Sequence, residues 1–463
     1  MDTGNNNCIT TVMKANHPPY GQNFPGHIPI GRFFDGKLML DFIASTIRIK
    51  RQYCHETHIN LYNDDLLTGV TFVSVGSCWD ELTTLATSAI PVFKQIDLFR
   101  DYIRVKRIVG DDQEKTNNII SIGNSKKLPS TILIFGDSTM DTGNNNYITT
   151  IMKANHPPYG QNFPGHIPTG RFSDGKLVPD FIASSIHIKE AVPPFLQPNL
   201  SDHELLSGVT FASAGSGWDD LTTLPTLVIP VSKQIDMFKD YMRRVKRIVG
   251  DDQEKAKTII SGALVVISAG TNDFGLNFYG IPTRRFQFIT IDAYQDFLLN
   301  KLQSFVKELH ELGCRTMVVA GLPPMGCLPI LQFIAKFQNP FNMKCLENEN
   351  SDARSYNDKL SKRINDMQAL LPNSEIVYAD IYKPLIDMIH DPQKYGFAET
   401  KRGCCGSGMI EAAILCNPAT PKCQNASQFL FWDSIHPSQS AYQFLTKHLV
   451  SEILPKLSFN HTS

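Results

Sequence analysis

The sequence has no excess of charge of either sign, and it has no long apolar run. Its 463 residues include 44 Lys and Arg against 45 Asp and Glu, a formal net charge of -1. This balance gives no reason to expect nucleic acid or an anionic membrane surface as a partner. The longest apolar runs, such as residues 263–267, are far shorter than the roughly 18 residues that indicate a transmembrane helix. We therefore expect no nucleic-acid partner and no integral membrane segment.

The first residues lack the features of a secretory signal, whereas the C-terminal third has features of a secreted protein. Residues 1–5 contain neither a basic stretch nor an apolar core, so no signal peptide is visible there. Seven of the ten cysteines lie in the last third, without Cys-x-x-Cys pairs or histidine-rich spacing. This pattern favours disulfides over zinc, and we expect no metal and no cofactor. Glycosylation acceptors at Asn199, Asn425 and Asn460 add a little weight to secretion.

An internal repeat explains the conflict between the two ends. Residues 2–7 recur as residues 141–146, and residues 69–72 recur as 208–211 with the same offset. The first copy begins after the position of the first strand and breaks off before its third, so it cannot be an enzyme by itself. We predict three parts: a catalytically dead duplicate over 1–123, a linker over 124–130 and a complete domain over 131–463. A duplicated enzyme fragment, or two adjacent genes joined, fits this arrangement.

From residue 130 onward, strand patterns alternate with helix patterns. Apolar residues recur at helical spacing around Ile235 and Phe238, and again around Leu298 and Phe305. Strands that alternate with helices predict a parallel sheet covered on both faces, an α/β fold. The predicted strands are residues 131–135, 209–212, 263–268, 316–320 and 376–379.

Three motifs carry the candidate chemistry. The apolar run 131–135 stops at Gly136, and Ser138 follows where open α/β sheets place their ligand sites. Gly-Thr-Asn-Asp at 270–273 ends another predicted strand, and Asp-Ser-Ile-His-Pro spans 433–437. Ser138 can serve as a nucleophile, His436 as its base and Asp433 as the group that orients the base. Each motif alone has a simpler interpretation, because Gly-Asp-Ser and Asn are also common turn residues.

Together and in this order, the three motifs resemble the GDSL family of SGNH-type serine esterases and lipases, in its plant form. The resemblance implies a flavodoxin-like three-layer α/β/α sandwich, and it covers roughly residues 130–455. It also implies that the backbone N–H groups of Ser138 and Gly215 and the side-chain amide of Asn272 form the oxyanion hole. The loop from His156 to Gly175 should lie beside the serine, although a surface loop without substrate contact is an alternative.

The resemblance also implies secretion and a pattern of disulfides. Cys327 should pair with Cys345, and two further bridges should form within the group Cys404, Cys405, Cys416 and Cys423, leaving Cys314 unpaired. It implies a serine ester hydrolase that acts on small lipid or acyl esters, and we expect a monomer. A carbohydrate acetyl esterase, or a non-catalytic product of a gene fusion, remains an alternative. The complete set of Ser138, Asn272, Asp433 and His436 favours the enzyme.

Overall fold

The computed structural model describes residues 128–280, 284–336 and 344–458, with a few positions between residues 15 and 23. The chain divides into two units, Met1–Lys126 and Lys127–Ser463, and the helices and strands given below belong to the second. The predicted duplicate over 1–123 and the acceptor Asn460 therefore lie outside the described residues, apart from those few positions.

Four parallel strands form the central sheet, in the order β1-β2-β3-β4. Every residue of the first three strands is buried, as expected for β-branched and apolar runs covered on both faces. Each strand lies within one residue of its predicted range. The strands are β1 (Ile132–Gly136), β2 (Leu264–Ser268), β3 (Thr316–Ala320) and β4 (Glu375–Ala379).

The strand predicted over 209–212 is wrong as a regular strand, but its residues do lie beside β1. Thr210 forms one parallel bridge to Ile134 and another to Pro194. The N–H of Ile134 donates to the carbonyl of Val209, and the N–H of Phe211 donates to the carbonyl of Ile134. On the outer side, the N–H of Thr210 donates to the carbonyl of Pro193, and the N–H of Phe195 donates to the carbonyl of Thr210. Counted with this segment, the sheet has the flavodoxin order 2-1-3-4-5.

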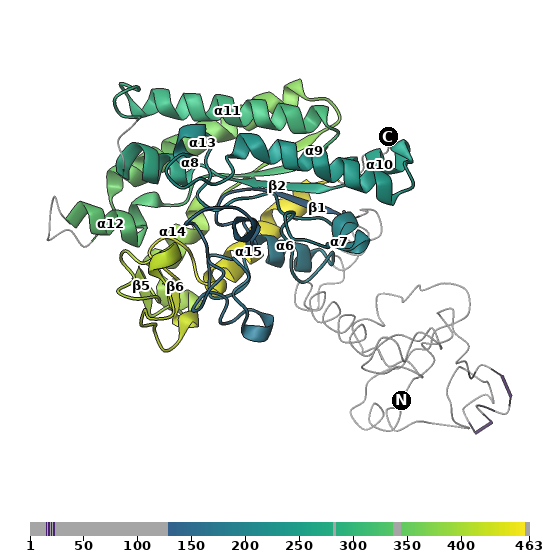
Figure 1. Ribbon diagram of the computed structural model, residues 1–463, viewed down its shortest axis with the longest axis horizontal. Coiled ribbons are helices and arrows are strands. Elements are labelled where there is room, and N and C mark those ends of the chain that lie inside the picture. The colour runs from purple at the N-terminus through teal and green to yellow at the C-terminus, as the bar shows by residue number, and fades with distance from the viewer. Residues whose placement is uncertain are drawn as a thin grey trace. The chain divides into compact units, whose positions relative to one another are not determined.

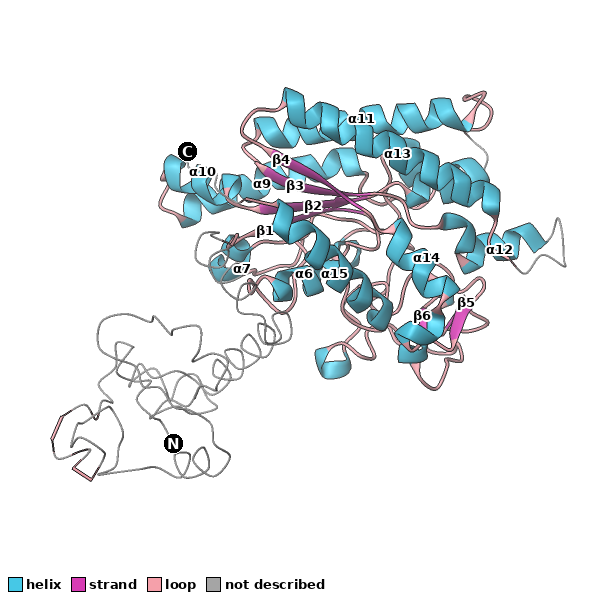
Figure 2. Cartoon of the chain, turned by 180° about the vertical axis from the view of Figure 1, so that it is seen from behind, coloured by secondary structure: helices cyan, strands magenta, loops and turns pink. Residues whose placement is uncertain are grey.

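Helices cover both faces of the sheet, which confirms the predicted three-layer architecture (Figures 1 and 2). On one face lie α9 (Val231–Ile248), α11 (Ile291–Glu311) and α13 (Glu347–Leu370). On the other lie α6 (Val178–Ser185), α14 (Tyr382–His390) and α15 (Gln439–Ile453). The remaining helices are α7 (Asp202–Ser207), α8 (Asp220–Thr223), α10 (Gln253–Ser261) and α12 (Pro329–Lys336), and β5 (Glu399–Gly403) and β6 (Phe429–Phe431) form a small second sheet.

The two helical stripes predicted from sequence face the core. Ile235 and Phe238 are buried on α9, and Leu298 and Phe305 are buried on α11. Thr290 begins α11 as an N-cap, because its hydroxyl accepts the N–H of Ala293. None of the described helices is long and apolar enough to span a bilayer.

Three disulfides join the cysteines of the last third. They are Cys327–Cys345, Cys404–Cys423 and Cys405–Cys416, which confirms the expected pairing within these two groups. Among the described residues, Cys314 is the one cysteine outside a bridge, and it is fully buried between α11 and β3. Asn199 and Asn425 are both exposed.

Candidate active site

Ser138 lies on a tight turn at the carboxyl end of β1. Gly136 has a φ of 140°, and a Cβ there would lie 1.9 Å from the carbonyl oxygen of Ser268, so only glycine fits. The N–H groups of Met140 and Asp141 then donate to the carbonyl of Asp137, which closes the turn. The Asp137 carboxylate is buried, and burial raises its pKa to about 6 although it accepts hydrogen bonds from Thr139. This turn fixes Ser138 at the edge of the sheet.

His436 lies between Ser138 and Asp433. Its Nε2 is 2.8 Å from the Ser138 Oγ, and its Nδ1 is 2.8 Å from the Asp433 Oδ2. The Asp433 Oδ1 accepts the backbone N–H groups of Ile435 and His436, at 2.9 and 2.8 Å. All three side chains are almost completely buried. In this arrangement Nδ1 carries the proton toward Asp433, which leaves Nε2 free to accept the serine proton.

Tyr159 completes the surroundings of Asp433, and the sequence analysis missed it. Its hydroxyl donates to the Asp433 Oδ2 at 2.8 Å and accepts the N–H of Ala413 at 2.9 Å. Burial, together with the nearby Asp433 charge, raises the pKa of Tyr159 well above its usual value. The hydroxyl therefore stays protonated and holds the carboxylate in place. The same His-Pro-Pro-Tyr sequence ends at Tyr20 in the first copy, which is a signal that could have drawn attention to it.

The loop from His156 to Gly175 packs against the histidine segment. The ring of Phe172 lies 4.9 Å from the ring of His436, and the hydroxyl of Ser173 donates to the carbonyl of Pro437. The Asp174 carboxylate accepts the N–H of Gln439 at the start of α15. The loop therefore lies beside the candidate base, as expected, and Phe172 contacts its ring.

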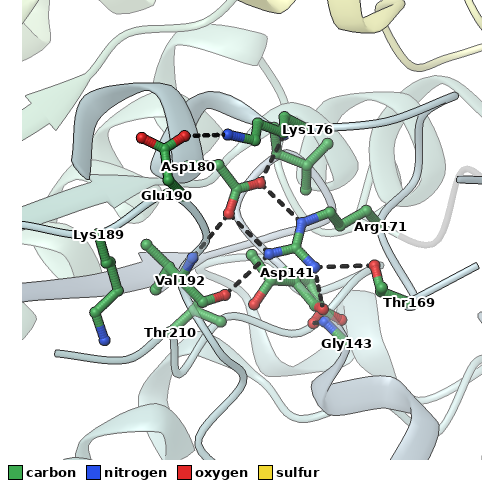
Figure 3. Close-up of polar contacts among 12 residues, drawn as sticks. Asp141, Gly143, Thr169, Arg171, Lys176, Asp180, Lys189, Glu190, Val192 and Thr210 are labelled. Atoms are coloured by element: carbon green, nitrogen blue, oxygen red, sulfur yellow. Dashed lines mark hydrogen bonds and ion pairs between the residues drawn. The ribbon is translucent and has the colours of Figure 1, made fainter. Parts of the chain in front are cut away.

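A buried ion pair anchors this loop to α6, and its arginine also contacts the segment that follows the Ser138 turn. Figure 3 shows the Arg171 guanidinium facing the Asp180 carboxylate, with two contacts of 2.7 and 2.8 Å. The same guanidinium donates to the carbonyl of Thr142 at 3.2 Å. Both partners of the pair are almost fully buried. Such a two-bond fork fixes direction as well as distance, so it holds the end of the loop against α6.

The three proposed oxyanion donors come from three separate segments. Asn272 follows β2, and its Nδ2 donates one hydrogen to the carbonyl of Ser216 at 2.9 Å, which orients the amide. Gly215 has a φ of 89°, a conformation that favours glycine. Within 128–280, 284–336 and 344–458, no acceptor takes the backbone N–H of Ser138 or of Gly215. Asn272 lines the same cavity as Ser138 and His436, whereas Gly215 does not line it.

Two buried carboxylates hold the segment around Gly215. Asp141 accepts the N–H of Ala214 at 3.0 Å and also the N–H groups of Gly143 and Asn144, so it joins the nucleophile turn to that segment. Asp273 accepts the N–H groups of Trp218 and Asp219. Burial raises the pKa of Asp141 to about 6 and of Asp273 to about 7, despite these donors. Each carboxylate therefore positions backbone rather than substrate.

The part of the chain that contains these residues is similar to known proteins. A family model described as GDSL-like Lipase/Acylhydrolase matches residues 132–449, which include every side chain described above. GDSL esterase/lipase At2g30310 from Arabidopsis thaliana is 55% identical over 337 residues, covering 73% of this chain and 93% of that protein. GDSL esterase/lipase At2g30220 from the same plant is 56% identical over 323 residues, covering 70% of this chain and 89% of that protein.

Proposed function

We propose that Ser138 is the nucleophile of this protein. The chain belongs to the GDSL-like lipase/acylhydrolase family and is a carboxylic ester hydrolase, so its reaction requires a nucleophile. In this proposal His436 is the general base and Asp433 is the group that orients it. The observation that carries the assignment is the distance of 2.8 Å between the His436 Nε2 and the Ser138 Oγ. No other serine of the described residues is hydrogen-bonded to a histidine ring that a carboxylate also holds.

The proposed reaction has two halves. The Ser138 Oγ attacks the ester carbonyl while His436 takes its proton, and the negative oxygen is stabilised by the N–H groups of Ser138 and Gly215 and by the Asn272 amide. His436 then returns the proton to the leaving alcohol, and an acyl-enzyme remains. A water molecule attacks the acyl group while His436 removes its proton, and His436 then returns this proton to the Ser138 Oγ as the bond to the acyl group breaks and the carboxylic acid leaves. Asp433 stabilises the imidazolium in both halves.

Replacing the nucleophile tests the assignment. Ser138→Ala should lower kcat/KM for an activated short-chain ester by about 10³-fold or more, while circular dichroism stays unchanged. Ser434→Ala is a matched control: Ser434 is a buried neighbour of Asp433, and its hydroxyl has no partner in the described residues. We expect the control to retain activity within tenfold. Activity in Ser138→Ala close to that of the control would disprove the nucleophile.

The location of the site supports the proposal that residues 1–123 are not needed for catalysis. Every candidate side chain lies between Ser138 and His436, within the unit Lys127–Ser463. The repeated segments 2–7 and 141–146 support the proposed duplication. A chain of residues 124–463 should therefore equal the full chain in kcat/KM and in melting temperature. A loss of many degrees on deletion would show that the first copy is part of the fold.

We further propose that the protein matures in an oxidising, glycosylating compartment. Three disulfides support this, since such bridges persist mainly in oxidising environments. The exposed acceptors Asn199 and Asn425 support it as well. Digestion of the plant-expressed protein with an N-glycosidase should increase its gel mobility, and the double variant Asn199→Gln, Asn425→Gln should show a smaller increase. Unchanged mobility of the parent would refute glycosylation.

A further inference from the structure

A cavity runs from the candidate active site into the interior, between the sheet and the helices α6, α14 and α15. Its mouth is formed by Ser138, Asn272 and His436. Beyond the mouth, most of the lining side chains are aliphatic, and Phe431 and Tyr442 add two aromatic rings. The aliphatic side chains of β2, β3 and α15 include Leu264, Val266, Val318, Leu445, Leu449 and Ile453. The cavity is therefore continuous with the reacting groups and is apolar along its depth.

The two faces of the sheet differ in how closely their side chains are packed. Val265, Ile267 and Val319 point to the opposite face and are 0%, 0% and 1% exposed. Val266 and Val318 alternate with them, line the cavity and are 4% and 6% exposed. The same strands are thus closely packed on one face and incompletely packed on the other. Protein interiors normally leave few voids larger than a water molecule, so a void of this extent beside the candidate nucleophile is a departure from ordinary packing.

We propose that this cavity binds the acyl chain of a medium-chain ester, octanoyl to decanoyl, with the ester carbonyl at Ser138. The inference rests on the proposed function, because it uses Ser138 as the group that attacks the carbonyl. The acyl chain enters between the sheet and α15, and the alcohol part of the ester stays outside the mouth.

The length of the cavity sets one limit on the chain. It is lined from Ser268, at the carboxyl end of β2, to Leu264, at its amino end. Four steps along a parallel strand span about 13 Å at a rise of about 3.3 Å each. Carbon–carbon bonds of about 1.5 Å advance an extended chain by roughly 1.3 Å per carbon, so about ten carbons fit.

The cavity is also larger than a single small molecule needs. The space open to the centres of water molecules is about 100 Å³, well above the roughly 10–15 Å³ of space that is the minimum for one water. The number of carbons is set by the length, which admits chains of about eight to ten carbons.

The lining also selects the chemistry of the chain. Leu264, Val266, Val318, Leu449 and Ile453 offer no hydrogen-bonding partner in the deep part of the cavity. A hydroxyl or charged group carried there would lose its water without compensation, which is costly. An acetyl group would leave the space empty. The cavity therefore favours unsubstituted alkyl chains over acetyl groups and over acids with a polar end.

A series of 4-nitrophenyl esters from acetyl to palmitoyl tests the proposal. Burial of each added methylene favours binding, up to about fourfold per group. After allowance for ordering the chain, kcat/KM should rise at least about 30-fold from acetyl to octanoyl. It should fall again for lauroyl and palmitoyl esters, whose ends exceed the cavity. A flat profile in the parent protein, with hydrolysis still abolished by Ser138→Ala, would overturn the acyl site and leave the proposed function standing.

Variants that fill the cavity give the second arm. Leu449→Trp on α15 should lower the ratio of octanoate to acetate kcat/KM by about tenfold, because the ring occupies space that the methylenes use. Gln443→Trp is the matched control: it adds the same ring to the exposed side of the same helix and should keep the parental ratio.

If Leu449→Trp does not fold, Val318→Phe can be used instead, because it fills the cavity from the side of the sheet. Circular dichroism and the melting temperature of each variant are measured before its kinetics, to establish that it is folded. Parental ratios in folded Leu449→Trp or folded Val318→Phe would show that the acyl chain binds elsewhere. If the parent protein hydrolysed none of the esters in the series, that result would instead count against the proposed function.

Discussion

On one face of the sheet, aromatic rings from several elements fill the space beneath α9 and α11. Phe135 of β1 stacks on Phe211 at 4.8 Å between ring centroids and meets Phe238 and Phe305 edge to face. On the other face, beneath α15, the side chains around Val266 and Val318 are mainly aliphatic, and the packing is incomplete. Large flat rings fill volume that branched aliphatic side chains leave open. One face of the sheet therefore serves mainly stability, whereas the other gives up packing for a cavity beside the nucleophile.

The largest expected effect comes from removing a side chain on the packed face. Phe238 is fully buried in the aromatic cluster, and Phe238→Ala should cost about 3–5 kcal/mol of the free energy of unfolding. Leu449 already borders the cavity, so Leu449→Ala loses fewer contacts and should cost about 2 kcal/mol, the lower end for such a change. Urea unfolding of both variants measures the difference. Equal losses would mean that the two faces are packed alike.

Adding volume should give a smaller contrast in the same direction. Val318 and Val319 are neighbours on β3 whose side chains point to opposite faces. Val319→Phe overfills the packed face and should cost about 1–3 kcal/mol, whereas Val318→Phe enters the cavity and should change stability by less than about 1 kcal/mol. Melting curves of the matched pair measure this. A larger loss in Val318→Phe than in Val319→Phe would reverse the comparison.

A modest loss of stability is expected at Tyr159, which contacts Asp433 beside the candidate nucleophile. Tyr159→Phe removes one hydroxyl, and with it the bonds to Asp433 and to Ala413. The loss should cost about 1–2 kcal/mol, since a buried acceptor and donor are left unpaired. We expect kcat to fall by about threefold to thirtyfold with little change in KM, because the carboxylate that orients His436 loses one restraint. Parental kcat would show that the remaining donors to Asp433 suffice.

Much of this architecture follows from local sequence. The runs 132–136 and 316–320 are β-branched and apolar, so both were predicted as strands to within one residue. Residues 209–212 look similar, but their outer neighbour is Pro194, and a proline in another segment cannot be recognised as a pairing partner from local pattern. Register and pairing depend on contacts distant in the chain, which periodicity does not contain.

In the candidate site, too, some features follow from local sequence and others depend on contacts distant in the chain. Ser138, Asn272, Asp433 and His436 lie in short motifs, so their residue types could be found from sequence, and the structure places Ser138, His436 and Asp433 in hydrogen-bond contact. Tyr159 lies 274 residues from its partner Asp433, and the recurrence of its motif at Tyr20 does not identify that partner. The cavity has no motif at all. It arises because Leu449 and Val318 do not fill the space between two layers, which is a property of assembled volumes.

The burial of Cys314 has a consequence for the three disulfides. Its thiol is fully buried, and burial raises its pKa to about 12. At neutral pH only about one thiol in 10⁵ is then ionised, and the thiolate is the form that attacks a disulfide. In the folded state Cys314 therefore cannot exchange with Cys327–Cys345 or with the other two bridges. Within the described residues, reshuffling of the native pairing has no internal nucleophile and needs a thiol from outside.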